Sequence, residues 1–452
     1  MTLCQILSEF VAERRDFSEE AIYLAKKSIL DSMGAIAAGS RTHLVERALT
    51  ISQGCGPSTI VGIGTGYSLR DAAFINGIAG HELELDDTSS SNLGHPTIAV
   101  LPSLLAVGEA EQVNGLTLIK AFLLAAEIEC KIGRICARKL HESGWHASSV
   151  TGVIGAAAGS AYLMQLDKER VCNAIGIAAS MASGIRENFG TATKSVHIGK
   201  TAQDGVHAAQ LARAGFDASK NALDGKEGYL FEYGRAEFGP FDEAFASTLG
   251  NDWDVCSPGF AIKRYPSCSS THRAIDALVD LIDTHHVKAS DIDEISVGLS
   301  ASALRELVTP YPKNGEEAKF SIGFQIALYL EGLDNMPEQY TEDVINREPI
   351  QNIIQRTRMY HVEKYDQLPV DMGVGPAFSA VRLKTGQTFS KEQIYPVGHL
   401  TNPISDQELK EKFLRCCMPV YGKKQSEKLY DRLFCLQDVQ NVAELMKEFV
   451  PD

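Results

Sequence analysis

The chain lacks several patterns that would place it in familiar classes of protein. Its ten cysteines include no CxxC pair, which argues against a zinc ribbon, a redox motif or common iron-sulfur ligation. We therefore expect reduced thiols. Apolar stretches such as Leu101 to Val107 are too short to span a membrane, and Met1 to Phe10 lacks a basic segment followed by an apolar run, so no secretory signal is predicted. We expect a cytoplasmic protein.

Positive charge is also scarce. The chain has 43 lysines and arginines against 58 acidic residues, a net charge of −15. Because this field repels phosphate, it argues against nucleic acid and anionic membranes as partners. An anionic substrate would need a locally basic pocket. The 452 residues, of which 44% are hydrophobic and 22% charged, suggest a compact globular protein of two domains.

Helical periodicity dominates the first part of the chain. Ser18 is a plausible N-cap, Glu19 and Glu20 suit a first turn, and apolar residues follow at helical spacing as far as Gly39. Similar patterns predict helices at residues 44–53, 70–83, 98–112, 115–138, 149–164, 168–181 and 200–214. The segment 152–161 is rich in alanine and glycine, which lets backbones approach closely. We expect that helix in the middle of a bundle.

The pattern changes after Pro266. It predicts a helix at 271–285, a strand at 292–299, a helix at 320–329, and strands at 359–365 and 380–395, the last turning at 384–387. Helical patterns return at 406–415, 423–433 and 439–449. The fold class we predict is mainly α: a discontinuous all-helical domain of residues 1–265 and 400–452, and a smaller α+β domain of residues 266–399.

An acidic stretch is the most conspicuous local feature. Glu84, Asp86, Asp87 and His95 fall within a dozen residues. Crowded carboxylates raise one another's pKa and need a cation, a donor network or a polar ligand. The alternatives are helix capping, solvent exposure, or a divalent metal bound by aspartate and histidine. No HExxH, facial-triad or two-metal spacing is present, so a metal is the weaker alternative.

A glycine-rich stretch, Val61 to Gly66, invites a nucleotide-binding interpretation. Its spacing fits neither GxGxxG nor GxxxxGK[ST]. We therefore predict a turn between two short strands.

Three further segments carry basic residues. His146 opens the alanine- and glycine-rich helix, where the helix dipole would lower its pKa. Lys194 lies in a predicted loop of small and hydroxyl residues that suits anion capture. Lys263 and Arg264 precede a Tyr-Pro turn at the predicted domain junction, where they could close over a polyanion. The alternatives are a structural histidine, a solvated lysine and a surface basic pair.

Cys268 follows this basic pair. It could be a nucleophile or a proton donor, but we favour a packing or substrate-lining role. Taken together, two lysine sites and two histidines suit a small molecule that bears several carboxylates.

In their order and spacing, these segments resemble the MmgE/PrpD family, which includes 2-methylcitrate dehydratase, cis-aconitate decarboxylase and iminodisuccinate epimerase. The resemblance runs nearly from end to end. Its matching pieces are Ile29–Gly34, Ala73–Gly77, His81, Asp86–Thr88, His95–Pro96, Leu101–Pro102, Gly144–His146, Thr193–Lys194, His197–Gly199, Lys263–Pro266 and Glu317–Ser321.

The resemblance implies an α+β lid, a homodimer, and catalysis without a metal or organic cofactor. By position, the residues that it implies for catalysis are His95, His146, Lys194 and Lys263. The residues that we expect to contact substrate are Glu84, Asp87, Thr88, Arg264 and Cys268. Two of them depart from the family, since Cys268 stands where some members have histidine and Glu84 where many have aspartate or alanine.

We therefore expect chemistry next to a carboxylate of a citrate- or aconitate-like substrate. The two lysines would hold carboxylates and stabilise negative charge, while the two histidines act as acid and base. Dehydration of the 2-methylcitrate type ranks first, decarboxylation second and epimerisation third. A binding or scaffold protein without turnover is the alternative from another class.

Overall fold

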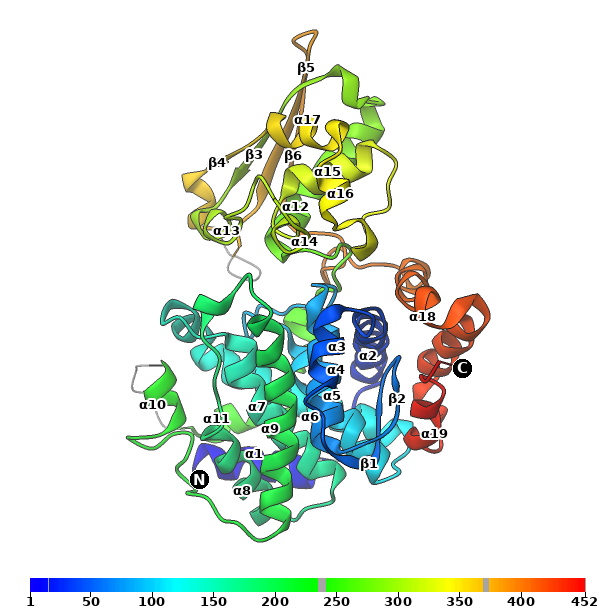
Figure 1. The fold of residues 1–452 in the computed structure, drawn as a ribbon. Coiled ribbons are helices and arrows are strands. Elements are labelled where there is room, and N and C mark those ends of the chain that lie inside the picture. Colours follow the sequence, from blue (N-terminus) through cyan, green and yellow to red (C-terminus); the bar gives the residue numbers. More distant parts are fainter. Residues whose placement is uncertain (15, 235–240, 369–373, 452) are drawn as a thin grey trace. The chain divides into compact units, whose positions relative to one another are not determined.

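The structure, a computed structural model, describes residues 1–14, 16–234, 241–368 and 374–451. The chain divides into two compact units. The first comprises Met1–Glu82, Asp86–Phe260 and Ser405–Asp452, and the second comprises Leu83–Leu85 and Ala261–Ile404. The first is almost entirely helical and the second combines helices with a sheet (Figure 1). The predicted fold class, mainly α with a smaller α+β domain, is confirmed.

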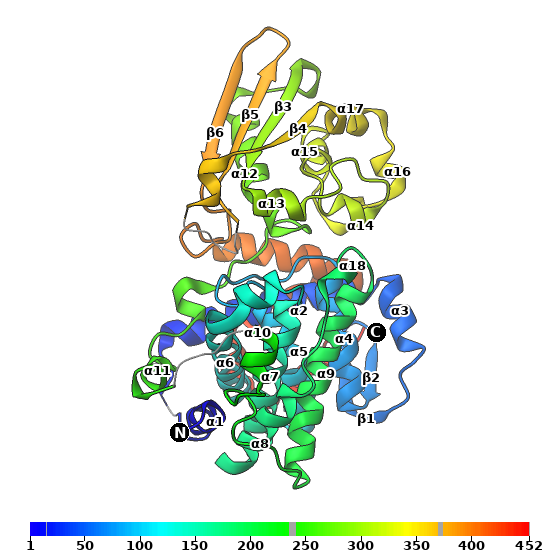
Figure 2. The ribbon, with the colours of Figure 1, turned by 90° about the vertical axis from the view of Figure 1, so that its left-hand side faces the viewer.

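Helix α7 (Ala147–Leu163) is the centre of the first unit. It packs against α5 (Pro96–Ala110), α6 (Gly115–Glu142) and α9 (Thr193–Arg213) (Figure 2). Small residues make this possible, because a Cβ on Gly155 would lie 2.4 Å from the carbonyl oxygen of Ala125. The predicted position of this helix inside a bundle is confirmed. Helix α4 (Leu69–Glu82) packs on α9, and its last turn brings His81 toward α5 and α7.

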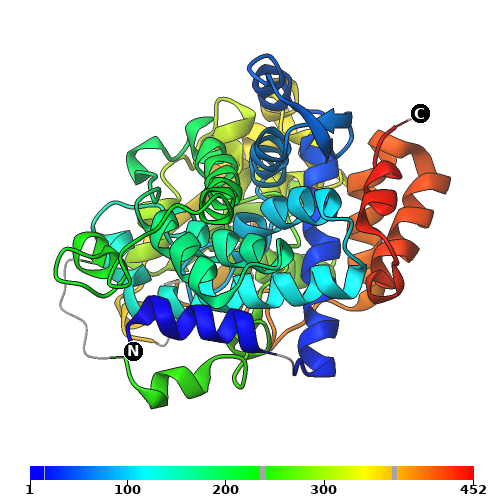
Figure 3. The ribbon, with the colours of Figure 1, turned by 90° about the horizontal axis from the view of Figure 1, so that it is seen from below.

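The remaining early elements surround this bundle. They are α1 (Leu3–Glu13), α2 (Glu19–Gly39), α3 (His43–Leu49), β1 (Cys55–Ile60), β2 (Gly64–Tyr67), α8 (Lys168–Ala179), α10 (Tyr229–Gly234) and α11 (Glu243–Thr248). Helix α1, dark blue in Figure 3, packs against α8. The predicted turn at the glycine-rich stretch is confirmed, because β1 and β2 pair in an antiparallel hairpin around it.

The C-terminal segment belongs to the first unit, which makes that unit discontinuous. It consists of α18 (Asp406–Phe434) and α19 (Val442–Lys447), and α18 packs along α2 (Figure 3). Lys412 and Asp31 form a buried ion pair between these two helices, with Nζ 2.6 Å from Oδ1. The sequence predicts two helices where α18 runs, and a break at Gly422, with φ of +72°, lies between them.

A four-stranded sheet organises the second unit (Figure 2). Its order is β4 (Thr357–His361), β3 (Ile292–Leu299), β5 (Ala377–Leu383), β6 (Thr388–Gln393). Strands β3 and β4 are parallel and the other pairs are antiparallel. The predicted strand at 292–299 and the hairpin turn at 384–387 are confirmed. The predicted strand at 359–365 ends early, because a turn of 3-10 helix occupies Glu363–Asp366.

Helices complete the core of the second unit. Helix α12 (Ser269–His285) packs against β5 and β6, and α15 (Ile322–Leu330) packs against both α12 and α17 (Glu348–Arg356). Shorter helices are α13 (Ala301–Glu306), α14 (Gly315–Ala318) and α16 (Glu342–Ile345). Leu278, Ile295, Val297, Phe324 and Ile354 are buried among them.

Across the described residues, no helix is both long enough and apolar enough to cross a membrane.

Candidate active site

Contacts of the loop at residues 89–95, which precedes α5, hold the backbone of His95 in place. Ser89 and Gly94 exchange backbone hydrogen bonds that close the loop, and the backbone N–H of His95 donates to Ser148 Oγ at 3.0 Å. A Cβ on Gly94 would lie 2.2 Å from that same oxygen, so only glycine fits beside α7. The close contact therefore fixes where α5 begins and where the His95 ring points.

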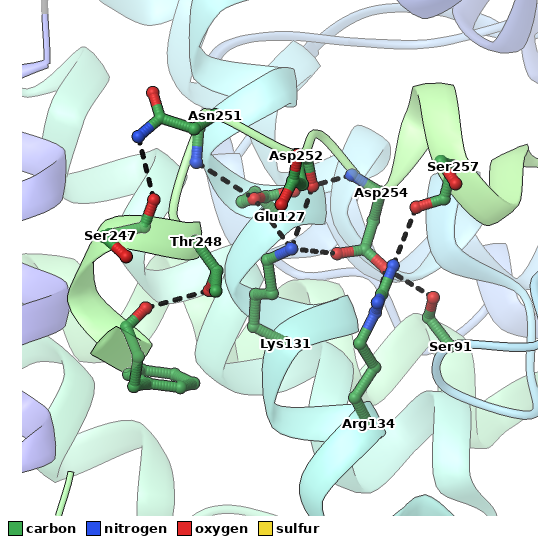
Figure 4. A network of polar contacts seen from close by, with 12 residues as sticks. Ser91, Glu127, Lys131, Arg134, Ser247, Thr248, Asn251, Asp252, Asp254 and Ser257 are labelled. Carbon is green, nitrogen blue, oxygen red and sulfur yellow. Dashed lines mark hydrogen bonds and ion pairs between the residues drawn. The ribbon is translucent and has the colours of Figure 1, made fainter. Parts of the chain in front are cut away.

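A network of ion pairs around the buried carboxylate of Asp254 anchors this loop on one side (Figure 4). The hydroxyl of Ser91 donates to the carboxylate of Asp254, which also accepts from Arg134 Nε at 2.8 Å. Lys131 Nζ lies 3.0 Å from Asp254 and 3.3 Å from Glu127. Burial, and next the charge of Asp254, raises the pKa of Glu127 to about 7. These contacts connect the loop to α6.

A second buried carboxyl holds the same loop. The side-chain amide of Asn92 donates to Glu129 Oε1 at 2.6 Å. Burial raises the pKa of Glu129 well above its usual value, which favours the neutral form of this carboxyl. The loop is thus fixed at two adjacent residues.

The carboxylate of Asp86 lies beside two histidine rings. Asp86 Oδ2 lies 2.7 Å from His81 Nδ1 and 3.1 Å from His95 Nδ1, and His95 Nδ1 is also 3.1 Å from the backbone oxygen of Asp87. Burial by itself would raise the pKa of Asp86, but His95 and His81 outweigh it and hold that pKa well below the usual range. Asp86 is therefore ionised in the folded protein.

His81 lies between the two histidines that the sequence predicts. Its ring centroid is 4.7 Å from that of His95, edge-on, and 5.7 Å from that of His146, stacked. Burial, and next the charge of Lys194, lowers the pKa of His81 to about 4. Its Nε2 atom is buried and has no hydrogen-bond partner among the described residues.

His146 occupies the N-cap position of α7, as predicted. Its Nδ1 lies 3.3 Å from Nδ1 of His197 on α9. Burial, and next the neighbouring His81 and Lys194, lowers the pKa of His146 well below its usual value. The predicted direction is thus right, but burial rather than the helix terminus is the main cause. The imidazole is neutral at neutral pH.

The predicted loop around Lys194 is wrong. Lys194 lies in the first turn of α9, which starts at Thr193 rather than near residue 200. Packing extends the helix, because Ser195 and His197 are buried and Ser195 Oγ donates to Glu82 at 2.8 Å. Tertiary contacts thus override weak local helix propensity. The charge of Lys194 lowers the pKa of His81, of His146 and of His197, after burial in each case.

In the second unit, Lys263 forms an ion pair with the carboxylate of Glu84. Its Nζ lies 2.8 Å from Glu84 Oε2, and both side chains are buried. Glu84 has φ of +54°, a left-handed conformation that costs a non-glycine residue about 1–3 kcal/mol. The roles predicted for Lys263 in catalysis and for Glu84 in substrate binding stay predictions.

Cys268 and Arg264 also belong to the second unit. Burial, and next the charge of Glu306, raises the pKa of Cys268 to about 12, so the side chain is a thiol at neutral pH. This state suits a lining role better than a nucleophile. The Arg264 side chain is 42% exposed, and its NH1 lies 3.9 Å from Asp276 Oδ1. Their contact with substrate stays a prediction.

Asp87 and Thr88 are buried residues of the first unit. The Asp87 carboxyl accepts from the backbone N–H of Thr97 at 3.2 Å and from its hydroxyl, so it caps the first turn of α5. Burial raises the pKa of Asp87 to about 7. A role in substrate binding stays a prediction for both.

Donor atoms gather closely enough for a metal ion at one place in the described chain. The group is His81, Asp86 and His95, whose atoms lie within 4.8 Å of one another. The Asp86 carboxylate lies within hydrogen-bond distance of both rings, which accounts for the grouping without an ion. Catalysis without a metal stays a prediction.

Comparison of the sequence with models of known families identifies the family of this chain. The model of the MmgE/PrpD N-terminal domain matches residues 5–237, and that of the MmgE/PrpD C-terminal domain matches residues 265–435. The chain belongs to the MmgE/PrpD family. The predicted resemblance is thereby confirmed.

Three proteins that are similar to this chain are named cis-aconitate decarboxylase. Cis-aconitate decarboxylase of Homo sapiens is 28% identical, over 95% of this chain and 90% of that protein. Cis-aconitate decarboxylase of Mus musculus is 26% identical, over 94% and 88%. Cis-aconitate decarboxylase of Aspergillus terreus is 23% identical, over 96% and 92%.

Sequence reasoning assigned no role in the site to His81, Asp86 or His197. All three lie in segments that match the MmgE/PrpD pattern, but no local periodicity indicates that their side chains meet. Asp86 and Asp87 are adjacent and chemically identical, and only Asp87 is expected from the sequence to contact substrate. The structure separates them, because one faces two imidazoles and the other caps a helix.

Proposed function

We propose that the protein is a lyase that decarboxylates an unsaturated tricarboxylate of the cis-aconitate type. The names of its relatives support this reaction, because the similarity covers at least nine-tenths of this chain for each of the three. The sequence ranks dehydration first. The relatives favour decarboxylation, the second of the predicted reactions.

The observation that carries the proposal is the histidine group beside Lys194. His81 and His146 are buried imidazoles with lowered pKa, and the cation of Lys194 is one cause in both. A neutral imidazole has a free ring nitrogen that can accept a proton and pass it on. A cation beside them attracts a carboxylate and stabilises negative charge that develops in the reaction. A group of this kind suits proton transfer to a carbanion.

The proposed reaction breaks one carbon–carbon bond. The departing carboxylate leaves as CO₂, and its bonding electron pair spreads over the neighbouring alkene and carboxylate. One proton then adds to carbon, so that the net change is loss of CO₂ and uptake of one proton. Lys194 stabilises the intermediate charge. His95 or His146 takes up a proton from solvent at its free ring nitrogen and passes it to carbon.

A substrate panel tests this function. Purified protein is mixed separately with cis-aconitate, 2-methylcitrate, citrate and iminodisuccinate, and CO₂ release and proton NMR spectra of the products are followed. We expect stoichiometric CO₂ from cis-aconitate at the highest kcat/KM of the four. Faster alkene formation from 2-methylcitrate, without CO₂, would replace decarboxylation by dehydration. If none of the four compounds reacts, and calorimetry detects no binding, the lyase proposal is overturned.

Two controls sharpen the panel. Activity after dialysis against a chelator should equal that of untreated protein, as the predicted independence from metals requires. Glu109→Gln should retain activity, because Glu109 is a buried carboxyl that accepts from Thr59 near the far end of α5. A comparable loss in Glu109→Gln and in His146→Gln would mean that the losses report folding rather than chemistry.

A further inference from the structure

Asp86 accepts from two rings with a single oxygen atom. Oδ2 is the atom nearest both His81 Nδ1 and His95 Nδ1, and the carboxylate and the His81 side chain are fully buried. The proposed proton transfer is assigned to His95 or His146, and no step in it is assigned to Asp86 or to His81. Buried ionised groups are costly unless their hydrogen bonds are satisfied, so this arrangement needs a reason.

We propose that Asp86 is a positioning residue that holds His95 in one tautomer, with its proton on Nδ1 and its lone pair on Nε2, and that His81 is the second donor that holds Asp86 in place. The catalytic meaning of this inference rests on the proposed function. The assignment of the tautomer does not depend on the proposed function.

The hydrogen-bond partners of His95 permit only this tautomer. Nδ1 lies 3.1 Å from the Asp86 carboxylate and 3.1 Å from the backbone oxygen of Asp87. A carboxylate and a carbonyl oxygen accept hydrogen bonds and cannot donate them. Nδ1 must therefore carry the proton. In a neutral imidazole the other nitrogen then holds the lone pair, which makes Nε2 the atom that accepts a proton.

His81 acts through Asp86. Its Nδ1 is 2.7 Å from Oδ2, the shorter of the two contacts, and its Nε2 has no hydrogen-bond partner among the described residues. Asp86 is thus the acceptor that orients the His81 ring, and the ring in turn fixes the oxygen that faces His95. Removing the Nδ1 donor at position 81 should loosen Asp86 without removing a group that reacts.

Backbone strain marks both ends of the same segment. Glu84, two residues before Asp86, has φ of +54°, and Leu93, two residues before His95, has φ of +47°. Non-glycine residues adopt this conformation at a cost of about 1–3 kcal/mol, usually where function demands a particular geometry. The strain is consistent with a segment selected to orient its side chains.

The tautomer can be read without any substrate. In protein labelled with ¹⁵N-histidine, long-range proton–nitrogen spectra distinguish protonated from bare ring nitrogens, and His95→Gln identifies the His95 signals. We expect a protonated Nδ1 and a bare Nε2 in the native protein. In Asp86→Ala the backbone oxygen of Asp87 is the remaining acceptor, and we expect the Nε2-protonated form to appear beside the native one. A fully protonated Nδ1 in Asp86→Ala would assign the tautomer to the Asp87 carbonyl and overturn the role of Asp86. A protonated Nε2 on His95 in the native protein would overturn the inference.

Steady-state kinetics of Asp86 variants provide a second test of the proposal. Asp86→Asn and Asp86→Ala should lower kcat by about 100-fold or more and change KM by less than about threefold, with far-ultraviolet circular dichroism unchanged. Formate should restore part of the kcat of Asp86→Ala by filling the vacated acceptor position. If the folded Asp86→Asn retains kcat within about threefold of the native value, the inference fails.

Two substitutions of His81 test whether its Nδ1 acts as a hydrogen-bond donor to Asp86. The side-chain amide of asparagine can replace the Nδ1 donor of histidine, whereas leucine cannot. We expect His81→Leu to lower kcat, and His81→Asn to recover about tenfold or more of that loss. Equal losses in both variants would overturn the positioning role of His81. Absence of turnover on cis-aconitate would overturn the proposed function alone, since the tautomer measurement stands without it.

Discussion

His146 and His197 face each other through the same ring atom, with their Nδ1 nitrogens 3.3 Å apart. A hydrogen bond between them needs one donor and one acceptor, so only one of the two atoms carries a proton. Burial lowers the pKa of both rings, which keeps them neutral at neutral pH. The tautomer of His146 is therefore coupled to that of His197.

This coupling predicts a role for His197 that the sequence did not indicate. His197→Leu leaves His146 Nδ1 without its partner and should lower kcat by about tenfold, less than the loss of a reacting acid or base. His197→Asn supplies a side chain that can donate or accept, and it should recover part of that loss. Steady-state kinetics on cis-aconitate check both variants. Unchanged kcat in a folded His197→Leu would contradict the prediction.

Lys194 should matter through its charge. Lys194→Gln removes a cation that lowers the pKa of His146, so that pKa should rise and the acid limb of the pH–rate profile should move to higher pH. Loss of charge stabilisation should also lower kcat/KM by about 100-fold.

Lys200→Gln is the matched control for Lys194→Gln. Lys200 lies on the same helix, and its side chain is 43% exposed and paired with Asp204. Its replacement should leave kcat within about threefold of the native value, because exposed ion pairs contribute little. Equal losses in the two variants would show that Lys194 has no special place in the site.

The pH dependence of stability should reveal the buried carboxyl of Asp87. Burial raises the pKa of Asp87 from 3.8 to about 7, so the folded state holds a proton that the unfolded state releases. This contribution to stability is present below about pH 4 and is lost as the pH rises through 7. Asp87→Asn cannot titrate. Its stability relative to the native protein should therefore improve by about 3 kcal/mol between pH 5 and pH 8.

Urea unfolding followed by tryptophan fluorescence measures this difference in Asp87→Asn. The two tryptophans, Trp145 and Trp253, both lie in the first unit, so the signal reports the unit that holds Asp87. A difference between the two proteins that stays constant from pH 5 to pH 8 would contradict the raised pKa.

The buried ion pair between α2 and α18 should govern docking of the C-terminal segment. Lys412→Met leaves Asp31, which is 2% exposed, without its cation, and should cost about 3–5 kcal/mol. The double variant Asp31→Asn with Lys412→Met should recover much of this loss, because both charges of the pair are then removed. Urea unfolding measures both.

The same two helices supply a control pair. Lys27 Nζ lies 2.9 Å from Asp406 Oδ1, but the Asp406 side chain is 46% exposed. Lys27→Met should therefore cost no more than about 1 kcal/mol. If it destabilises as much as Lys412→Met does, burial is not what makes the Asp31 pair important.

Much of the local structure could be predicted from particular residues. Ser18 caps α2 as expected, the alternation at residues 292–299 is a strand, and His146 opens α7. These are short-range features, because capping, periodicity and turn chemistry depend on residues close in sequence. Lys194 was misplaced, since helix propensity around it is weak and its helical turn depends on contacts made by Ser195 and His197.

The sequence by itself determined which residue types the first unit's site contains: His95, His146 and Lys194 stand out by their neighbours, whatever the fold. The tertiary structure alone decided which acidic residue faces them. Asp86 and Asp87 are adjacent and chemically identical, yet successive side chains leave the backbone in different directions. One meets two imidazoles and stays ionised, while the other is buried against Thr97 and holds a proton up to about pH 7. That difference arises from burial and long-range contacts, which local sequence does not encode.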